Sequence, residues 1–362
     1  MLRCQQTLQP LELTAEGLYS RAADLLYPVR DDLVFMGYPA ESNAFMQTVM
    51  EEERVHQTSP DLIGDNYAFL DLSSAVVGEL IDLLRTRDAL RDGMVGVEIG
   101  AGSGWVSWLF AEAGCEMWPC ELEPNSLATG LVFRHPKIGE RHRIVCDAAL
   151  LPFDDGAFDL VLCKEFAHHI VDKRALFMEA NRVLRPGGLL VMLEPVQCLS
   201  AWIETLRHPD PHTGHAVGWI RDYLEALRAA GFTTTERGSY HYREGGRFRV
   251  TRRLRERSRE AIRRRELTLD PLTRGFMNLF GGTLWVLARK TASAARVPRP
   301  PLKLVSPSQL RVTKAELALY EPFAELLRER SPARAVMAED EFDEALRTRA
   351  GVAAREHGRD RS

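Results

Sequence analysis

The sequence predicts an α/β fold built on a mostly parallel, doubly wound sheet, and three observations carry this prediction. A β-rich run leads into a glycine-rich turn at residues 95–104, directly before an apolar helical stretch. Strand-like segments then alternate with helical ones as far as Glu194, as in βαβ units. Two of the later strand-like segments end in an acidic residue, Glu121 or Asp147, at the edge where parallel sheets place ligand-binding groups.

The turn has glycine at every second position, namely Gly100, Gly102 and Gly104. Glycine lets the backbone bend sharply and approach a ligand without a Cβ atom in the way. The helix that begins at Trp105 presents N–H groups without intrahelical partners to the same ligand. A dinucleotide fold would need its third glycine where Trp105 stands, and the acidic Glu98 suits a ligand with a cationic group.

Four further segments complete the pattern. The sequence predicts strands near residues 116–121, 143–147, 158–164 and 189–194, the last after a Pro-Gly-Gly turn. This ordered series resembles the class I S-adenosylmethionine (SAM)-dependent methyltransferases, especially the small-molecule branch that includes the ubiquinone and menaquinone C-methyltransferases. The resemblance covers roughly residues 90–236 and 282–290. It implies a Rossmann-like core of seven strands with SAM as the cofactor.

The resemblance also implies where SAM is held. Gly100, Ala101 and Gly102 are expected beneath its methionine part, and Glu98 is expected to support the turn and to reach the amino group through water. Lys164, at the end of the fourth strand, is counted with the cofactor-binding residues.

The nucleoside part of SAM is expected at the next two strand ends. Glu121 matches the carboxylate that accepts hydrogen bonds from both ribose hydroxyls, with Glu123 as the alternative. Asp147 matches the acceptor for the adenine amine, and the Ala148 N–H is expected to meet a ring nitrogen. Two leucines are expected to sandwich the adenine, namely Leu122 and Leu150.

The segment from Lys164 to His169 lies where open α/β sheets place their chemistry. Methyl transfer is a direct displacement, so alignment supplies much of the rate, and a base is needed only if the acceptor arrives protonated. His168 and His169 have a suitable pKa for a general base and are the catalytic candidates. By the resemblance, one histidine of such a run often braces the loop instead. Glu194, at the end of the fifth strand, could also face the site.

Residues 1–90 are expected to form a helical N-terminal lid. Thr14 could cap a first helix whose apolar face consists of Leu18, Ala22, Leu25 and Leu26. A second helix is predicted over about 73–84, and a polar-aromatic loop over 64–69. The resemblance implies that such an extension folds over the SAM site. Tyr67 is then a candidate for packing near the cofactor, and a core tyrosine is the equal alternative.

A basic insertion interrupts the end of the predicted core. After a helix near 217–230 and a sixth strand near 232–242, the seventh strand is expected only at 282–290. The insertion, residues 243–281, has twelve arginines between Arg243 and Arg274. They could form a solvated helix with ion pairs between successive turns. The alternative is a cap for a phosphorylated or carboxylated substrate, or for a lipid surface.

The domain organisation predicted is therefore a lid at 1–90, a SAM-binding core at 91–290 and a C-terminal extension at 291–362. The extension starts with a proline-rich linker and continues with another predicted helix near 339–348. Before that helix, an amphipathic helix is predicted from the spacing of Leu317, Tyr320, Phe323, Leu326 and Leu327. These helices could pair two subunits, so a homodimer is one hypothesis.

Composition and missing motifs exclude several classes of protein. The net charge of −4 gives no bulk attraction to nucleic acid, and Cys163-Lys-Glu-Phe stands where adenine-N6 methyltransferases carry a Pro-Pro motif. The six cysteines form no CxxC pair and are expected to be small buried thiols in a reducing compartment. No run of about 18 apolar residues predicts a transmembrane segment. A loop with His208, His212 and His215 is expected to be exposed or to contact substrate, rather than to bind a metal.

The sequence thus predicts a cytoplasmic SAM-dependent methyltransferase that acts on O, N or C of a small-molecule acceptor, without a metal. An anionic or lipid-like acceptor, engaged by the basic insertion at a membrane surface, is one alternative. A SAM-fold protein that has lost catalysis and acts as a binding or regulatory subunit is the other.

Overall fold

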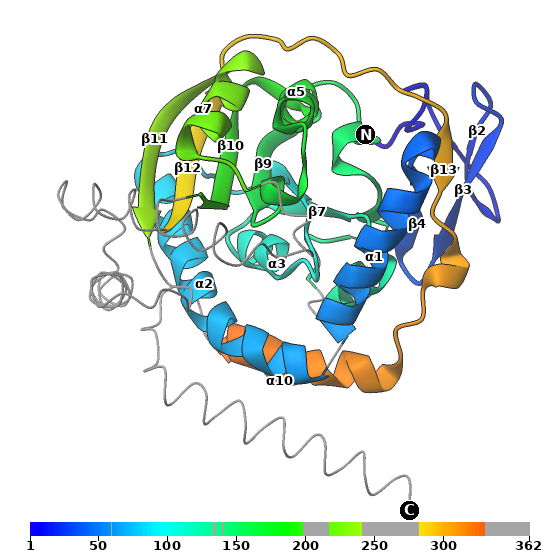
Figure 1. Ribbon diagram of the computed structural model, residues 1–362, viewed down its shortest axis with the longest axis horizontal. Coiled ribbons are helices and arrows are strands. Elements are labelled where there is room, and N and C mark those ends of the chain that lie inside the picture. Colours follow the sequence, from blue (N-terminus) through cyan, green and yellow to red (C-terminus); the bar gives the residue numbers. More distant parts are fainter. Residues whose placement is uncertain (59, 133–134, 140, 198–216, 241–281, 330–362) are drawn as a thin grey trace, which may run out of the picture.

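The computed structural model describes residues 1–362 except 59, 133–134, 140, 198–216, 241–281 and 330–362. These residues form one large twisted sheet with helices on both faces (Figure 1). The basic insertion, the loop with His208, His212 and His215, and the second predicted C-terminal helix lie outside the described residues.

Seven strands in the order β8-β7-β6-β9-β10-β12-β11 form the centre of the sheet. Neighbouring strands pair in parallel except β12, which is antiparallel to both β10 and β11. This confirms the predicted seven-stranded core, with its last strand after the insertion. The bounds are β6 Val95–Ile99, β7 Glu116–Glu121, β8 Arg143–Val145, β9 Phe158–Lys164, β10 Leu184–Val196, β11 Phe232–Tyr240 and β12 Gly282–Lys290.

Both faces of this sheet are buried, which explains why its strands are nearly continuous apolar runs. Successive side chains of a strand point to opposite faces, and in β10 both kinds of position are apolar: Val191 packs on one face and Met192 on the other. One face is covered by α2 (Pro60–Thr86), α3 (Trp105–Glu112) and α10 (Lys314–Glu329). The other face is covered by α5 (Lys173–Val183) and α7 (Ile220–Ala229).

The prediction of a helix near residues 14–26 is wrong, because this segment forms strands. Residues 12–39 contain β1 Glu12–Leu13, β2 Gly17–Ser20, β3 Leu25–Arg30, β4 Leu33–Phe35 and β5 Gly37–Pro39. Asp31 and Asp32 have φ of 50° and 66° and form a two-residue turn between β3 and β4. Asp tolerates this left-handed conformation. The residues whose apolar spacing resembled a helix lie in the preceding hairpin, in which β2 pairs antiparallel with β3. β4 then pairs in parallel with β8 and extends the central sheet.

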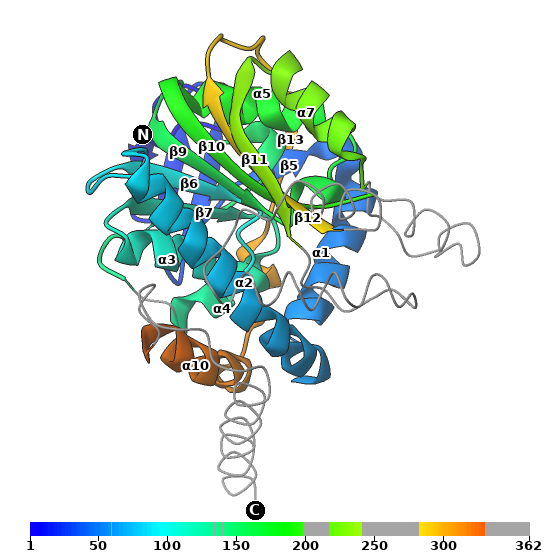
Figure 2. The ribbon, with the colours of Figure 1, turned by 90° about the vertical axis from the view of Figure 1, so that its left-hand side faces the viewer.

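Within residues 1–90, which were predicted to form a helical lid, α-helices begin only after residue 42. A short 3₁₀ turn, η1 (Ala40–Ser42), leads into α1 (Asn43–Thr58) and then α2. The loop predicted at 64–69 is wrong, because α2 runs through it; one glycine costs a helix only about 1 kcal/mol relative to alanine. In Figure 2 the parallel strands run downward, and α1 lies beneath their carboxyl ends. Tyr67 lies in α2, and its side chain is outside the described residues.

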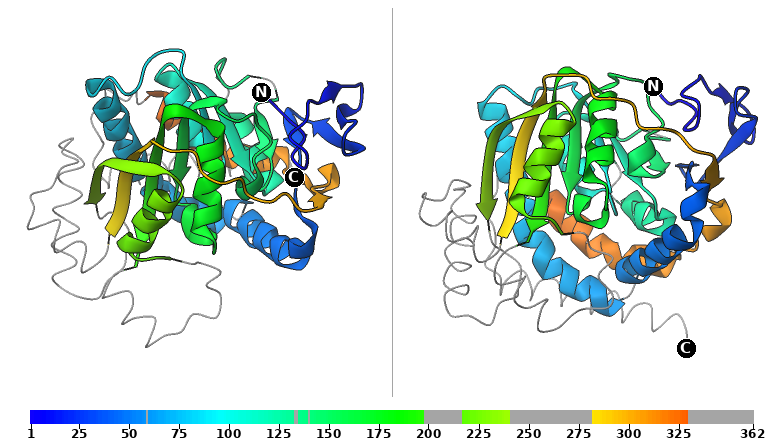
Figure 3. Two further views of the ribbon diagram at one scale, coloured as in Figure 1. Left: turned by 90° about the horizontal axis from the view of Figure 1, so that it is seen from above. Right: turned by 45° about the horizontal axis from the view of Figure 1, so that its top comes forward.

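The C-terminal segment wraps around the core instead of forming a separate unit. From the end of β12 it passes across the outside of α7 and α5 towards β5, a path visible in both views of Figure 3. There β13 (Leu302–Leu304) pairs antiparallel with β5, before η5 (Pro307–Gln309) and α10. The first predicted amphipathic helix is confirmed by α10, which buries Tyr320 and Leu327.

Two predictions from composition can be compared with the described residues. Five cysteines are buried thiols, as expected: Cys4, Cys115, Cys120, Cys146 and Cys163. Within the described part of the chain, none of the helices is both long and apolar enough to span a bilayer.

Candidate cofactor and active site

The glycine turn after β6 has the unusual backbone that the sequence predicts. Gly100, Gly102 and Gly104 have φ of 67°, 52° and 74°, in the left-handed region that glycine adopts without a steric cost. The Ala101 N–H donates to the Cys120 carbonyl at 2.9 Å, which joins the turn to the neighbouring strand β7. The turn therefore lies at the carboxyl ends of β6, β7, β8 and β9, here called the carboxyl edge.

Glu98 holds the start of helix α3. Its Oε2 atom accepts the Ser107 N–H at 2.8 Å and the Ser107 hydroxyl at 2.6 Å, and the side chain is buried. Burial raises the pKa of Glu98 to about 7, opposed by these hydrogen bonds and by the charge of Lys164. These contacts fix the first turn of α3, and support of the glycine turn by Glu98 stays a prediction.

Glu121 links β7 to the glycine turn. One carboxylate oxygen accepts the Gly102 N–H at 3.0 Å, and the other accepts the N–H groups of Leu122 at 2.7 Å and Glu123 at 3.2 Å. The side chain is buried at the carboxyl edge. A carboxylate at this position is fixed in direction by the backbone before any ligand arrives.

Glu123 has a different task. It is the N-cap of α4 (Pro124–Thr129), where its carboxylate accepts the Ser126 N–H at 2.6 Å and the Asn125 amide at 2.6 Å. Its side chain is only 3% exposed. This local role favours Glu121 over Glu123 as the ribose-binding candidate.

Asp147 lies two residues after the end of β8 and caps the 3₁₀ turn η3 (Ala148–Leu150), accepting the Ala149 N–H at 2.8 Å. Burial raises the pKa of Asp147 to about 6. The Cys146 N–H donates to the Glu121 carbonyl at 2.9 Å, so the two acidic strand ends are adjacent. Ala148 and Leu150 are buried beside them, and Leu122 is half-buried.

Lys164 ends β9 on the other side of the glycine turn. Its ammonium lies 3.0 Å from the carboxylate of Glu165 and 5.2 Å from the ring centre of Trp105, the first residue of α3. Glu165 has φ of 51°, a conformation that non-glycine residues adopt at a cost and that clusters at functional sites. Sequence reasoning missed Glu165, and no local pattern pointed to its backbone.

Glu194 anchors the loop that carries the two histidines. It is fully buried, so the prediction that it could face the site is wrong. Its carboxylate accepts the N–H groups of Phe166 at 2.8 Å and Ala167 at 2.7 Å, and it lies 2.9 Å from Nδ1 of His168. A buried carboxylate needs such partners, and the loop provides them.

The two histidines therefore occupy different environments. His168 is buried against Glu194, while His169 is half-buried, with its ring 4.1 Å from that of His168. The ring of Phe166 packs on the glycine turn: a Cβ atom on Gly100 would lie 2.0 Å from the ring. Gly100 is thus needed for this contact, which the sequence did not reveal because the two residues are 66 positions apart.

The described residues contain no group of three or more His, Cys, Asp or Glu side chains arranged to hold a metal ion. The three histidines considered for a metal are outside the described residues.

Comparison with known proteins identifies this arrangement. Residues 97–192 match a family model described as a methyltransferase domain. The chain carries a methyltransferase domain. The matched residues run from β6 to β10 and include the glycine turn, Glu121, Asp147 and the histidine loop.

The chain is similar to curated proteins that are named methyltransferases. An uncharacterized methyltransferase of Mycolicibacterium gilvum is 30% identical over 186 residues, 51% of this chain and 66% of that protein. The ubiquinone/menaquinone biosynthesis C-methyltransferase UbiE of Burkholderia mallei is 26% identical over 183 residues, 49% of this chain and 74% of that protein. The chain spans 52–66% of the length of the first relatives that it matches.

The chain is also similar to solved structures of methyltransferases. A putative sarcosine dimethylglycine methyltransferase from Galdieria sulphuraria has 17% identity and a TM-score of 0.41, covering 61% of this chain and 86% of its own. A geranyl diphosphate C-methyltransferase from Streptomyces coelicolor has 19% identity and a TM-score of 0.41, covering 58% and 75%.

SAM is the cofactor of the methyltransferase domain. The residues at the carboxyl edge fit it: two buried carboxylates lie at adjacent strand ends, beside a glycine turn whose backbone takes left-handed angles. SAM offers hydroxyl and amine donors that such carboxylates accept.

Proposed function

We propose that this chain is a SAM-dependent methyltransferase that transfers a methyl group to O, N or C of a small-molecule acceptor. The observation that carries the proposal is the convergence of Glu121, Asp147 and Lys164 from three strand ends around one glycine turn. All three side chains are largely withdrawn from solvent and held by hydrogen bonds or ion pairs. Bound SAM supplies an activated methyl group on a sulfonium.

The nucleoside would be held by residues whose direction is already set. Glu121 would accept the ribose hydroxyls, and Asp147 would accept the adenine amine next to the Ala148 N–H. Leu122 and Leu150 would cover the two faces of the adenine, as the resemblance implies. Preformed acceptors lower the entropy lost on binding.

The methionine part would lie along the backbone of Gly100, Ala101 and Gly102. Lys164 would then face its carboxylate, since the ammonium is close to the first residue of α3. Glu98 would support this binding indirectly, because its carboxylate fixes the first turn of α3.

The geometry favours His169 over His168 as a proton acceptor. His168 is occupied with Glu194 and is buried, which suits a residue that holds the loop. An imidazole nitrogen of His169 would take the proton from an acceptor O–H or N–H as the bond to carbon forms. Alignment of the acceptor with the methyl group would supply most of the rate.

The test is transfer of labelled methyl from SAM to a panel of small acceptors that bear hydroxyl, amine or activated carbon groups. The proposal predicts transfer to at least one acceptor class, with kcat lowered in His169→Ala if that acceptor is protonated. A folded protein that binds SAM but labels none of the acceptor classes would argue for a binding role instead.

A further inference from the structure

We propose that Gln5, acting through Gly37, is a positioning residue for Asp147 and thereby sets the preference of the site for adenine. Both residues lie outside the matched range 97–192, in the N-terminal segment that adds β1 to β5 to the methyltransferase domain. The inference rests on the proposed function of Asp147 as the acceptor for the adenine amine.

The backbone of Gly37 joins Gln5 to Asp147. The Asp147 N–H donates to the Gly37 carbonyl at 3.2 Å. The side-chain amide of Gln5 donates to that carbonyl at 2.8 Å and accepts the Gly37 N–H at 2.7 Å. Gln5 is fully buried, and its side-chain amide is satisfied by hydrogen bonds to Gly37. These two bonds hold the Gly37 backbone at both its N–H and its carbonyl.

Gly37 is also fixed by the strands around it. The neighbouring Met36 donates its N–H to the Val145 carbonyl at 2.8 Å, and its own carbonyl accepts the Val305 N–H at 2.8 Å. A Cβ atom on Gly37 would lie 2.4 Å from the Lys303 carbonyl, so β13 approaches as closely as a glycine allows. The acceptor for the Asp147 N–H therefore has little room to move.

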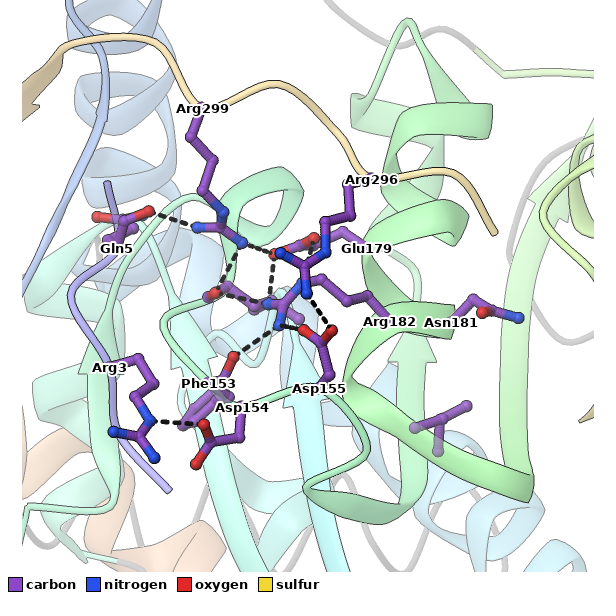
Figure 4. Close-up of polar contacts among 12 residues, drawn as sticks. Arg3, Gln5, Phe153, Asp154, Asp155, Glu179, Asn181, Arg182, Arg296 and Arg299 are labelled. Carbon is purple, nitrogen blue, oxygen red and sulfur yellow. Dashed lines mark hydrogen bonds and ion pairs between the residues drawn. The ribbon is translucent and has the colours of Figure 1, made fainter. Parts of the chain in front are cut away.

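The C-terminal segment fixes Gln5 in turn, as Figure 4 shows. Arg299 donates to the Gln5 carbonyl, to the Leu151 carbonyl at 3.2 Å and to the carboxylate of Glu179. Arg299 is 10% exposed on its side chain and Glu179 is 1% exposed, so the pair lies inside the protein.

Arg182 completes the cluster from α5. It binds Glu179 with two nitrogens at 2.7 and 2.9 Å and donates to the carbonyls of Leu151 at 2.9 Å and Phe153 at 2.7 Å. The segment from residue 147 to 153 is thus held at its start by Gly37 and at its end by two arginines. This segment contains Asp147, Ala148 and Leu150, the residues expected around the adenine.

This support of Asp147 should decide which nucleobase the site accepts. The Asp147 carboxylate already accepts the Ala149 N–H, so its direction follows the backbone of its own turn. Adenine presents an amine donor to this carboxylate, whereas hypoxanthine presents a carbonyl oxygen at the same position. If the turn is displaced, the hydrogen bond to the amine is lost first, while ribose and methionine contacts remain.

The experiment compares S-adenosylhomocysteine with S-inosylhomocysteine by calorimetric titration of the full chain. For the wild type we expect roughly tenfold or greater preference for the adenine ligand, since a charged group left opposite a carbonyl loses its hydrogen bond. Gln5→Ala should reduce this preference about fivefold or more while changing the affinity for the inosine ligand less than about twofold. Gln9→Ala, an exposed glutamine in the same segment, is the matched control and should keep the wild-type ratio.

A second variant keeps the proposal testable if Gln5→Ala does not fold. Gln5→Glu has the same shape and can accept the Gly37 N–H but, when ionised, cannot donate to its carbonyl, so it should also lower the ratio. A folded Gln5 variant with the wild-type ratio would overturn the inference and leave the proposed function intact. A wild type that binds neither ligand, or both equally, would instead overturn the assignment of Asp147 itself.

Discussion

The carboxylate of Glu121 accepts the backbone N–H of Gly102 at 3.0 Å. This contact joins the end of β7 to the middle of the glycine turn after β6, the two places that the proposed site needs to hold in register. The second carboxylate oxygen of Glu121 accepts the N–H groups of the next two residues, Leu122 and Glu123. Glu121 therefore organises the turn as well as being the candidate for binding the ribose.

Replacing Glu121 by Gln should weaken binding of S-adenosylhomocysteine roughly tenfold to a hundredfold, because a charged acceptor is exchanged for a neutral amide. Calorimetric titration measures this effect. Glu123→Gln is the matched control two residues away: it disturbs the cap of α4 and should lower stability, but should change ligand affinity much less. Equal losses of affinity in the two variants would contradict the assignment.

Gly100→Ala should destabilise the protein by more than its backbone angle alone explains. Both Gly100 and Gly187 have positive φ, 67° and 75°, which costs an alanine about 1–2 kcal/mol. Only Gly100 has a neighbour, the ring of Phe166, where the Cβ atom would stand. Urea denaturation should show about 1–3 kcal/mol of additional loss in Gly100→Ala relative to Gly187→Ala. Adding Phe166→Ala should recover part of it; equal losses for the two glycines would refute the contact.

Glu194→Gln should lower the free energy of unfolding by about 2 kcal/mol, because several N–H donors of the histidine loop lose a charged acceptor in a buried place. Glu225→Gln, in the exposed pair with Arg221, is the control and should leave stability nearly unchanged. Thermal or urea unfolding distinguishes them. A Glu194 variant as stable as the control would mean that the loop is held by other contacts.

Glu98 should make stability depend on pH in a defined direction. Its pKa is raised from the ordinary value of 4.5 to about 7 in the folded protein, so between these values the folded state binds more protons than the unfolded state. The contribution of Glu98 to stability is therefore greatest at low pH and declines as pH rises. Glu98→Gln removes this decline, and its unfolding free energy relative to wild type should rise by about 2–3 kcal/mol from pH 5 to pH 8. A difference that stays constant with pH would contradict the buried carboxyl.

The core was predictable because its signals are local. The glycine turn lies within ten residues of sequence, and Glu121 and Asp147 each end a strand-like run, so pattern alone placed them at one edge. β12 was also predictable, since its apolar run stands out after the basic insertion. The roles of Glu121 and Asp147 in binding stay predictions, whereas their placement at adjacent strand ends is observed.

The features that the sequence did not predict depend on contacts between different segments of the chain. The spacing of Leu18, Ala22, Leu25 and Leu26 fits a helix, but it does not reveal the antiparallel pairing of β2 with β3, in which this segment takes part. The burial of Glu194 depends on a loop 26–28 residues earlier in the chain. The link from Gln5 to Gly37 spans 32 residues and continues to Asp147, and no local pattern predicts it.

The most direct test of the central claim is calorimetric titration of the wild type and of Gly102→Asp with S-adenosylhomocysteine. Gly102 has positive φ and donates its N–H to Glu121, so a carboxylate side chain there should both strain the turn and repel Glu121. We expect binding on the order of micromolar for the wild type and none for Gly102→Asp, with circular dichroism showing that the variant is still folded. Undiminished affinity in the folded variant, or no binding by folded wild type, would contradict the proposed cofactor site.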